Sequence, residues 1–206
     1  MRTSPVIPVL VIDDAATALP IARALVAGGL KVLEVTLRTK AALDAIREMQ
    51  RVDGSIVGAG TVLNETDLHA ALDAGAEFIV APGLTETLGR AAIKSGAPFL
   101  PGIANAGDIM RGLDMGLTHF KFFPAEAAGG IAALRAISAP FGMAKFCPTG
   151  GITLTTAADW LALPSVLCVG GSWIVGKGPP DLAAITAAAR ACAALTRQAR
   201  EPRAEP

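Results

Sequence analysis

Short runs of apolar and β-branched residues alternate along the chain with longer segments rich in alanine and leucine. The short runs have the length of buried strands, and the longer ones have the apolar spacing of helices that pack on one face. The expected strands are Val6–Ile12, Lys31–Leu37, Ser55–Val62, Phe78–Pro82, Phe99–Ile103, His119–Pro124, Ala144–Thr149 and Val166–Gly170. The expected helices lie near residues 15–27, 40–50, 65–74, 85–95, 106–115, 129–138, 155–162 and 181–200.

Polar residues stand where most of the expected helices begin. A Ser, Thr, Asp or Asn at that position can accept hydrogen bonds from the first amide groups of the helix. The expected N-cap residues are Asp14, Thr39, Asn64, Thr85, Asn105 and Thr153 or Thr155. Glycines, which often end helices, follow several of these segments at Gly28, Gly75, Gly96 and Gly116.

Eight strand–helix units follow one another without a long linker. This order predicts an α/β fold of the (β/α)8 or TIM barrel type, in which parallel strands close inside a ring of helices. We expect a single domain over residues 1–196 and a frayed polar tail over residues 197–206. A doubly wound open sheet is the alternative, but it usually has a GxGxxG turn after its first strand. The corresponding turn here, residues 12–15, reads IDDA.

Composition narrows the class of protein. The chain has 206 residues, 52% hydrophobic and 17% charged, with a formal net charge of zero, which excludes disorder by composition. The absence of a basic run argues against a nucleic-acid or anionic-membrane surface, and apolar runs such as Val6–Ile12 are too short to span a bilayer. Three cysteines without a CxxC spacing favour a reducing compartment, so a cytoplasmic location is expected. The two histidines, His69 and His119, have no second metal ligand at motif spacing, and no metal site is expected.

One cation lies inside the most aromatic expected strand, His119–Pro124. Because strand side chains alternate, Phe120 and Phe122 point one way and Lys121 points the other. An uncompensated ammonium group is costly to bury, since desolvation disfavours its charged form. The lysine could lie on an edge strand and reach water. We favour instead an enclosed amine that is partly neutral and therefore nucleophilic.

Polar groups also occupy alternate positions of the second expected strand. Glu34, Thr36 and Arg38 share one face, near the C-terminal strand ends where barrels of this kind hold their active sites. A buried Glu34–Arg38 pair that satisfies itself is one interpretation. The other is a site in which the Arg38 fork holds a planar carboxylate, with a hydroxyl from Thr61 at the end of the third strand.

Glycine pairs follow the last two expected strands, at Gly150-Gly151 and at Gly170-Gly171 before Ser172. Barrels of this type frequently bind phosphate on the loops after strands seven and eight. Backbone N–H groups without side chains can approach phosphate oxygens closely, and a helix N-terminus helps. Each pair alone could be an ordinary tight turn, but two at matching places predict a substrate with a terminal phosphate.

An enclosed amine, a carboxylate, an arginine and a phosphate cradle together fit Schiff-base chemistry. The amine of Lys121 would attack a ketone, and the protonated imine nitrogen is an electron sink for breaking an adjacent carbon–carbon bond. Glu34 would move protons, directly or through a water molecule.

Five motifs spread over nearly the whole chain resemble those of one known family. They are residues 34–39 (EVTLRT), 58–63 (GAGTVL), 120–126 (FKFFPAE), 146–152 (FCPTGGI) and 170–173 (GGSW). The family is that of the 2-keto-3-deoxy-6-phosphogluconate (KDPG) aldolases, which includes enzymes that also act on 4-hydroxy-2-oxoglutarate. The resemblance implies a class I aldolase, usually a homotrimer, that cleaves KDPG to pyruvate and glyceraldehyde 3-phosphate in the Entner–Doudoroff pathway. It implies no metal and no other cofactor, because the Schiff base forms on the protein itself.

The resemblance also implies roles for single residues. Lys121 matches the Schiff-base lysine and Glu34 the general acid/base, while Arg38 and Thr61 match residues around the pyruvyl carboxylate. The other matches lie along the substrate, at Thr149, at the phosphate-binding Gly150, Gly151, Gly171 and Ser172, and at the pocket walls Pro82 and Phe123. Members of the family begin with a short helix ahead of the first strand, whereas this chain reaches Val6 almost at once. The sequence therefore does not identify which residues cover the lower end of the barrel.

Three other interpretations remain. A phosphate-binding barrel isomerase or epimerase would use Lys121 only as a charge. A phosphogalactonate aldolase would share the imine chemistry but act on the other configuration at C4. A non-catalytic binding barrel would have no physical need for a buried ammonium group. The expected partners are a small phosphorylated keto acid and pyruvate, and neither nucleic acid nor membrane.

Overall fold

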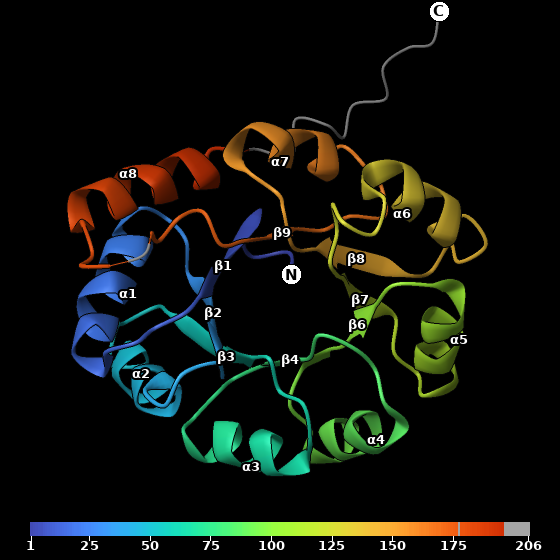
Figure 1. Ribbon diagram of the computed structural model, residues 1–206, viewed down its shortest axis with the longest axis horizontal. Coiled ribbons are helices and arrows are strands. Elements are labelled where there is room, and N and C mark those ends of the chain that lie inside the picture. Colours follow the sequence, from blue (N-terminus) through green and yellow to red (C-terminus); the bar gives the residue numbers. More distant parts are fainter. Residues whose placement is uncertain (177, 196–206) are drawn as a thin grey trace, which may run out of the picture.

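In the computed structural model, which describes residues 1–176 and 178–195, parallel strands line the inside of a ring of helices (Figure 1). The strands are β1 (Val6–Leu10), β2 (Val32–Thr36), β3 (Ile56–Gly60), β4 (Ile79–Val80), β5 (Phe99–Leu100), β6 (Gly102–Ile103), β7 (His119–Phe122), β8 (Lys145–Pro148) and β9 (Val169–Gly171). The helices are the 3-10 turn η1 (Ala15–Thr17) and α1 (Ala18–Ala27), α2 (Ala42–Met49), α3 (Glu65–Asp73), α4 (Glu86–Ser95), α5 (Ala106–Asp114), α6 (Gly130–Ser138), α7 (Leu154–Leu161) and α8 (Leu182–Ala193).

The predicted order of strands and helices is confirmed, with one difference. The expected strand Phe99–Ile103 is divided into β5 and β6 at Pro101, which has no amide N–H to give to a ladder. The carbonyl of Pro101 still accepts a hydrogen bond of 2.8 Å from the Lys121 amide. The tail over residues 197–206, predicted to be frayed, lies outside the described residues.

The strand ladders are parallel and fall into two sheets. One sheet has the order β5-β4-β3-β2-β1-β9 and the other the order β6-β7-β8. Two isolated parallel bridges, Phe146 to Val166 and Thr149 to Gly170, connect the second sheet to the region of β9. The arrangement is therefore a curled parallel α/β sheet with the helices on its outside, and consecutive helices lie side by side around the ring (Figure 1).

Most helix starts follow from the predicted caps. The side chains of Asn64, Thr85, Asn105 and Thr153 each accept a hydrogen bond from the backbone three residues later. Asp14 caps η1 in a similar way, through the Ala16 amide. The prediction for Thr39 is wrong. Helix α2 begins three residues later without a side-chain cap, because the Thr39 hydroxyl donates instead to the carbonyl of Ile12.

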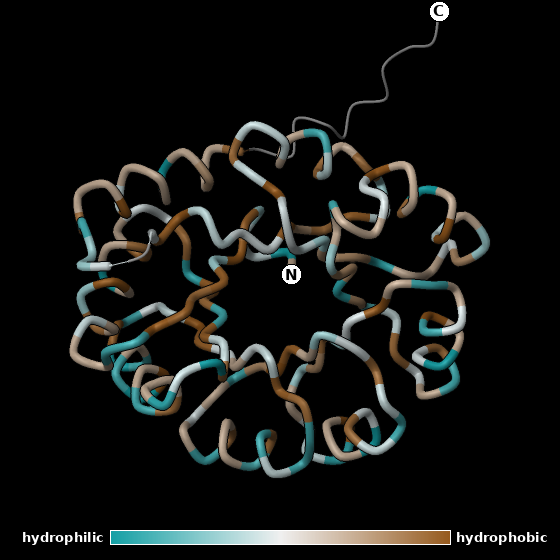
Figure 2. The backbone as a smooth tube through the Cα atoms, in the orientation of Figure 1, coloured by the Kyte–Doolittle hydropathy of each residue, from teal (hydrophilic) through white to brown (hydrophobic). Residues whose placement is uncertain are grey.

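Apolar side chains form two separate clusters on the two faces of the strands. The larger cluster lies between strands and helices and contains Phe120 and Phe122, both fully buried as predicted from strand alternation. The smaller one has residues from strands all around the ring: Ile7, Val32, Val80, Leu100, Cys147 and Cys168. In Figure 2, brown hydrophobic stretches follow parts of the strands inside the ring of helices.

Close packing of the first helix on the last one predicts a strong effect of a small substitution. At the end of α1, a Cβ added to Gly28 would overlap the Cβ of Ala189 and lie 2.8 Å from the carbonyl oxygen of Thr186. Backbone cannot yield as a flexible side chain can, so we expect Gly28→Ala to lower the free energy of unfolding by about 1–3 kcal/mol. Urea titration monitored by circular dichroism measures this change.

Gly142→Ala is the matched control, since a Cβ there would meet nothing within 4 Å. Its effect should stay within about 0.5 kcal/mol, as for most surface substitutions. Equal stability of the two variants would contradict the tight packing of α1 on α8.

Candidate active site

A buried ion pair joins two strands that are not neighbours. The Nζ atom of Lys121, on β7, donates a hydrogen bond of 3.0 Å to Oε1 of Glu34, on β2. The two side chains are only 7% and 4% exposed. Because β2 and β7 belong to different sheets, these side chains meet across the space that the strands enclose. The structure thus contradicts an edge lysine that reaches water, and it brings the two predicted catalytic residues together.

Glu34 does not pair with Arg38, which was the simpler interpretation of that strand. Arg38 is exposed at the end of β2, and its Nε donates to the hydroxyl of Thr61, 3.4 Å away. Thr61 has φ of 59°, a left-handed conformation that is unfavourable for a β-branched residue. Such strain is often found at functional sites, where the surrounding structure holds it in place. Arg38 and Thr61 therefore form a second polar group at the mouth of the ring, beside the ion pair.

Small and aromatic neighbours shape the surroundings of the ion pair. A Cβ added to Gly60, at the end of β3, would overlap Oε1 of Glu34 and lie 2.7 Å from its Cγ. The glycine thus leaves the room that the carboxylate occupies. On the other side, Nζ of Lys121 lies 5.5 Å from the centre of the Phe123 ring, within range of a cation–π attraction. The Phe123 ring therefore lies beside the Lys121 ammonium group.

Two buried thiols, those of Cys147 and Cys168, lie near the ion pair, and Cys147 pairs with Lys121 in the ladder of β7 and β8. A hydrogen bond between the two thiols lowers the pKa of the Cys147 thiol, and the nearby Lys121 cation acts in the same direction. The same hydrogen bond, with burial, raises the pKa of the Cys168 thiol well above its ordinary value. Sequence position gave no sign of this contact, since the two residues belong to different strand regions. The effect of Lys121 on the Cys147 thiol shows how closely the small inner cluster approaches the ion pair.

The two predicted glycine pairs lie side by side. Thr149 is buried and bridges to Gly170, where an added Cβ would lie 2.8 Å from Cγ2 of Thr149. The glycines after Thr149, Gly150 and Gly151, have φ of 105° and 81°, which side-chain-bearing residues rarely adopt. Gly171 ends β9, immediately before Ser172. The first turn of α7, capped at Thr153, follows the same loop. These groups gather at the carboxyl ends of β8 and β9.

Pro82 lies next to the strand that pairs with the lysine strand. An added Cβ at Gly102 would overlap the Pro82 carbonyl, and Gly102 pairs with Lys121 in the ladder of β6 and β7. The Pro82 carbonyl thus lies beside Gly102, the residue that pairs with Lys121 across the ladder.

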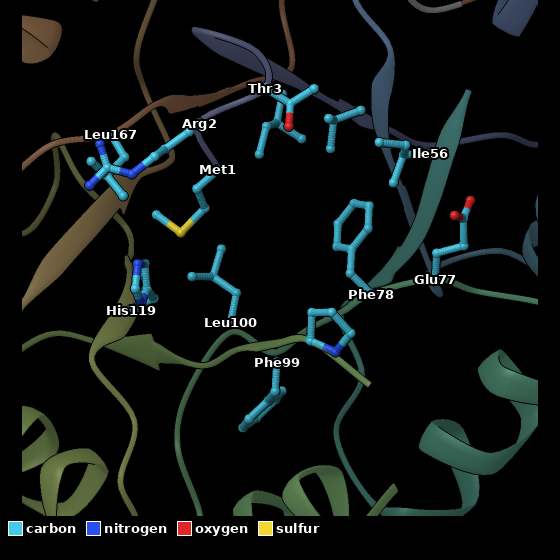
Figure 3. Close-up of a pocket in the computed structure, with 13 residues that line it drawn as sticks. Met1, Arg2, Thr3, Ile56, Glu77, Phe78, Phe99, Leu100, His119 and Leu167 are labelled. Atoms are coloured by element: carbon cyan, nitrogen blue, oxygen red, sulfur yellow. The ribbon is translucent and has the colours of Figure 1, made fainter. Parts of the chain in front are cut away.

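A pocket of about 660 Å³ opens at the other end of the strands (Figure 3). It is lined by the first residues of several strands, such as Val32, Ile56 and Phe99, and by the N-terminal residues of the chain. His119 lies on its wall, where burial lowers the pKa of the imidazole. The histidine is thus at the amino end of β7, in the wall of this pocket. None of the predicted site residues lines this pocket.

Two further features concern only the described part of the chain. Among residues 1–176 and 178–195, no three His, Cys, Asp or Glu side chains gather as a metal site. None of the described helices is long and apolar enough to cross a membrane.

Known proteins resemble this chain over nearly its whole length. The family model described as aldolase, KDPG and KHG aldolase, matches residues 1–188. The 2-dehydro-3-deoxy-phosphogluconate aldolase of Zymomonas mobilis is 59% identical over 199 residues, which are 97% of this chain and 96% of that protein. A crystal structure of the Zymomonas mobilis KDPG aldolase with 3-phosphoglycerate has a TM-score of 0.94 and 58% identity, covering 96% of this chain and 95% of that one. A Legionella pneumophila KDPG aldolase, with pyruvate captured as a covalent carbinolamine, has a TM-score of 0.90 and 47% identity, covering 93% and 95% of the two chains. The chain therefore belongs to the KDPG and KHG aldolase family.

Proposed function

We propose that this aldolase cleaves KDPG to pyruvate and glyceraldehyde 3-phosphate through a Schiff base on Lys121. The observation that carries the proposal is the buried hydrogen bond of 3.0 Å between Nζ of Lys121 and Glu34. An amine with an acid/base group at this distance is what imine formation requires. The related Legionella aldolase, in which pyruvate was captured as a covalent carbinolamine, supports the same chemistry here.

The ion pair can supply the nucleophile by itself. Transfer of one proton along the hydrogen bond turns the ammonium and the carboxylate into an amine and a carboxylic acid. This transfer needs no group outside the pair, and the amine it produces has the free electron pair that attacks a carbonyl carbon. Lys121 then attacks the C2 ketone, and Glu34 passes two protons to the ketone oxygen, first its own and then one lost by the attached nitrogen, so that the oxygen leaves as water and a protonated imine remains.

Cleavage and release use the same two groups. The C3–C4 bond breaks as the C4 hydroxyl loses its proton, and the bonding electrons pass into the iminium to give an enamine. The aldehyde leaves, C3 takes up a proton, and water hydrolyses the imine to pyruvate and free Lys121. Glu34 carries protons between the C4 hydroxyl, the enamine carbon and the incoming water. Because the protonated imine is the electron sink, this route needs no metal and no organic cofactor.

The two ends of the substrate meet different groups. We assign the carboxylate to Arg38 and Thr61, whose side chains are already 3.4 Å apart at the mouth of the ring. We assign the phosphate to the adjacent loops that carry Gly150, Gly151, Gly171 and Ser172, with Thr149, Pro82 and Phe123 along the pocket between the ends. The family is named for KHG as well, so we extend the proposal to 4-hydroxy-2-oxoglutarate, which would yield pyruvate and glyoxylate.

We further propose that residues 1–196 form one closed (β/α)8 barrel that assembles as a homotrimer in the cytoplasm. The pairing of β1 with β9 and the bridges from β8 to residues 166 and 170 support closure. So does the fact that β5 and β6 are separated only by Pro101. The trimer and the location rest on the family resemblance and on the cysteine pattern of the sequence.

Borohydride trapping tests the central step. Incubation with pyruvate and borohydride should add one reduced pyruvyl group to the chain, and peptide mapping should find it on Lys121. Lys121→Ala and Lys121→Arg should abolish both labelling and cleavage, because neither side chain can form the imine. Lys145→Arg, at the amino end of β8, is the control and should label as the unaltered chain does. An isomerase or epimerase that uses Lys121 only as a charge would give no adduct, and turnover by either Lys121 variant would contradict the assignment.

Glu34→Gln separates proton transfer from imine formation. The amide retains the size of the carboxylate but cannot exchange a proton, so cleavage should slow by about 10²–10⁴-fold while some imine still forms. Steady-state cleavage and the trapping assay measure the two effects. Glu86→Gln, which removes an exposed carboxylate paired with Arg90 on α4, should leave both unchanged. A Glu34 variant with normal turnover would remove this residue from the mechanism.

Arg38→Ala tests the carboxylate end of the substrate. Loss of a hydrogen bond between two charged groups should raise the KM for pyruvate in the condensation direction by about 10–100-fold. Arg47→Ala, which removes an exposed arginine paired with Asp44 on α2, is the control. An unchanged KM would mean that another group holds the carboxylate.

Comparison of turnover on KDPG and on its C4 epimer separates this function from that of a phosphogalactonate aldolase.

A further inference from the structure

The loop that leaves the lysine strand is joined to the glycine loop that we assign to the phosphate. The amide of Ala125 donates to the carbonyl of Thr149 at 2.8 Å, and the amide of Glu126 donates to the carbonyl of Gly150 at 3.0 Å. Two backbone hydrogen bonds therefore hold the loops together, and Glu126 lies directly beside the glycine pair.

The side chain of Glu126 is tied to a helix as well. Its Oε1 accepts a hydrogen bond of 2.9 Å from the indole Nε1 of Trp160, on α7. The Trp160 ring is fully buried, and its centre lies 6.3 Å from that of Phe122, the residue after the lysine. A rigid aromatic group thus fixes the position of the Glu126 carboxylate relative to β7.

The glycine loop rests on the stem of this glutamate. A Cβ added to Gly151 would lie 2.7 Å from both Cβ and Cγ of Glu126, so the backbone of the loop lies directly against that side chain. The φ of 81° at Gly151 also requires a residue without a side chain. Because backbone N–H groups bind an anion only when they point at it, a shift of the stem would change how the loop meets a phosphate.

We propose that Glu126 is a positioning residue for the substrate phosphate, held by Trp160 and supporting the loop of Gly150 and Gly151. This inference rests on the proposed function and extends it to a group that neither reacts nor touches the substrate. The carboxylate is itself an anion beside an anion site. Besides fixing the Glu126 side chain, the indole N–H of Trp160 occupies one of the carboxylate oxygens, which stays hydrogen-bonded to α7.

Kinetics with two aldehydes tests the proposal. Condensation with pyruvate is measured for glyceraldehyde 3-phosphate and for unphosphorylated glyceraldehyde. Glu126→Ala should raise the KM for the phosphorylated aldehyde about tenfold, the usual scale for one charge-assisted hydrogen bond, and leave the unphosphorylated reaction and imine trapping unchanged. Glu126→Gln, which still accepts from Trp160, should restore most of the affinity. Trp160→Phe, which removes only the N–H from a ring of similar shape, should act in the direction of Glu126→Ala.

Glu77→Ala is the matched control. Glu77 is also an exposed glutamate that accepts a single hydrogen bond from nitrogen, at 3.1 Å from the Val57 amide, but it lies at the amino ends of the strands. Its substitution should leave the KM for both aldehydes unchanged. An unchanged KM for glyceraldehyde 3-phosphate in Glu126→Ala would overturn the proposal. Equal losses with both aldehydes would do the same, as would a glutamine variant as impaired as the alanine one.

Calorimetric binding of inorganic phosphate separates this inference from the proposed function, because it needs no catalysis. Phosphate should bind the unaltered chain about tenfold more tightly than it binds Glu126→Ala. If no imine is trapped in the unaltered chain, the aldolase mechanism fails, and the phosphate result still decides the role of Glu126. Equal phosphate affinity in the two proteins would overturn that role even if the aldolase chemistry holds.

Discussion

The architecture depends on one pair of opposite charges held almost without water. Burying an ammonium and a carboxylate costs several kcal/mol for each ion, and their mutual attraction offsets this cost only when the geometry is good. Here Lys121 and Glu34 approach to 3.0 Å from strands in different sheets. The two sheets must therefore hold β2 and β7 at a fixed separation, and Gly60 must leave space for the carboxylate. An apolar pair would stabilise the fold as well, so the charges are best understood as a requirement of the chemistry.

The inner apolar cluster separates the two ends of the strands. Ile7, Val32 and Leu100 belong both to this cluster and to the wall of the lower pocket, whereas Cys147 reaches toward Lys121 from the same cluster. A layer of apolar side chains thus lies between the pocket at the amino ends and the ion pair. Water that enters the lower pocket meets this layer before it meets the amine. The layer therefore keeps the surroundings of the ion pair apolar on the side of the lower pocket.

Much of this arrangement could be predicted from single positions. Alternation in the aromatic strand placed Lys121 opposite Phe120 and Phe122, and the presence of a cation in an apolar run led us to predict a functional role for it. The sequence predicted that Glu34 and Lys121 share one site, but not the direct hydrogen bond between them, because local pattern says which face a side chain occupies and not which distant atom it meets. The same limit applies to the Cys147–Cys168 contact and to the bond between Trp160 and Glu126, whose partners lie 34 residues apart. The wrong cap at Thr39 has another cause, since its hydroxyl binds a carbonyl 27 residues earlier in the chain.

The charges of the site explain why its shape matters so much. Lys121 and Glu34 neutralise each other, and the residues assigned to the phosphate are three glycines and a serine, which carry no charge. A phosphate held in this way gains little from Coulomb attraction and depends on N–H groups that already point at it. Two of those glycines adopt positive φ, and the backbone around them is fixed by hydrogen bonds to the loop that follows β7. In the proposed mechanism, the strand that carries Lys121 would therefore also set the distance between the reactive carbon and the phosphate. A substrate of one length can then reach both ends of the site at once.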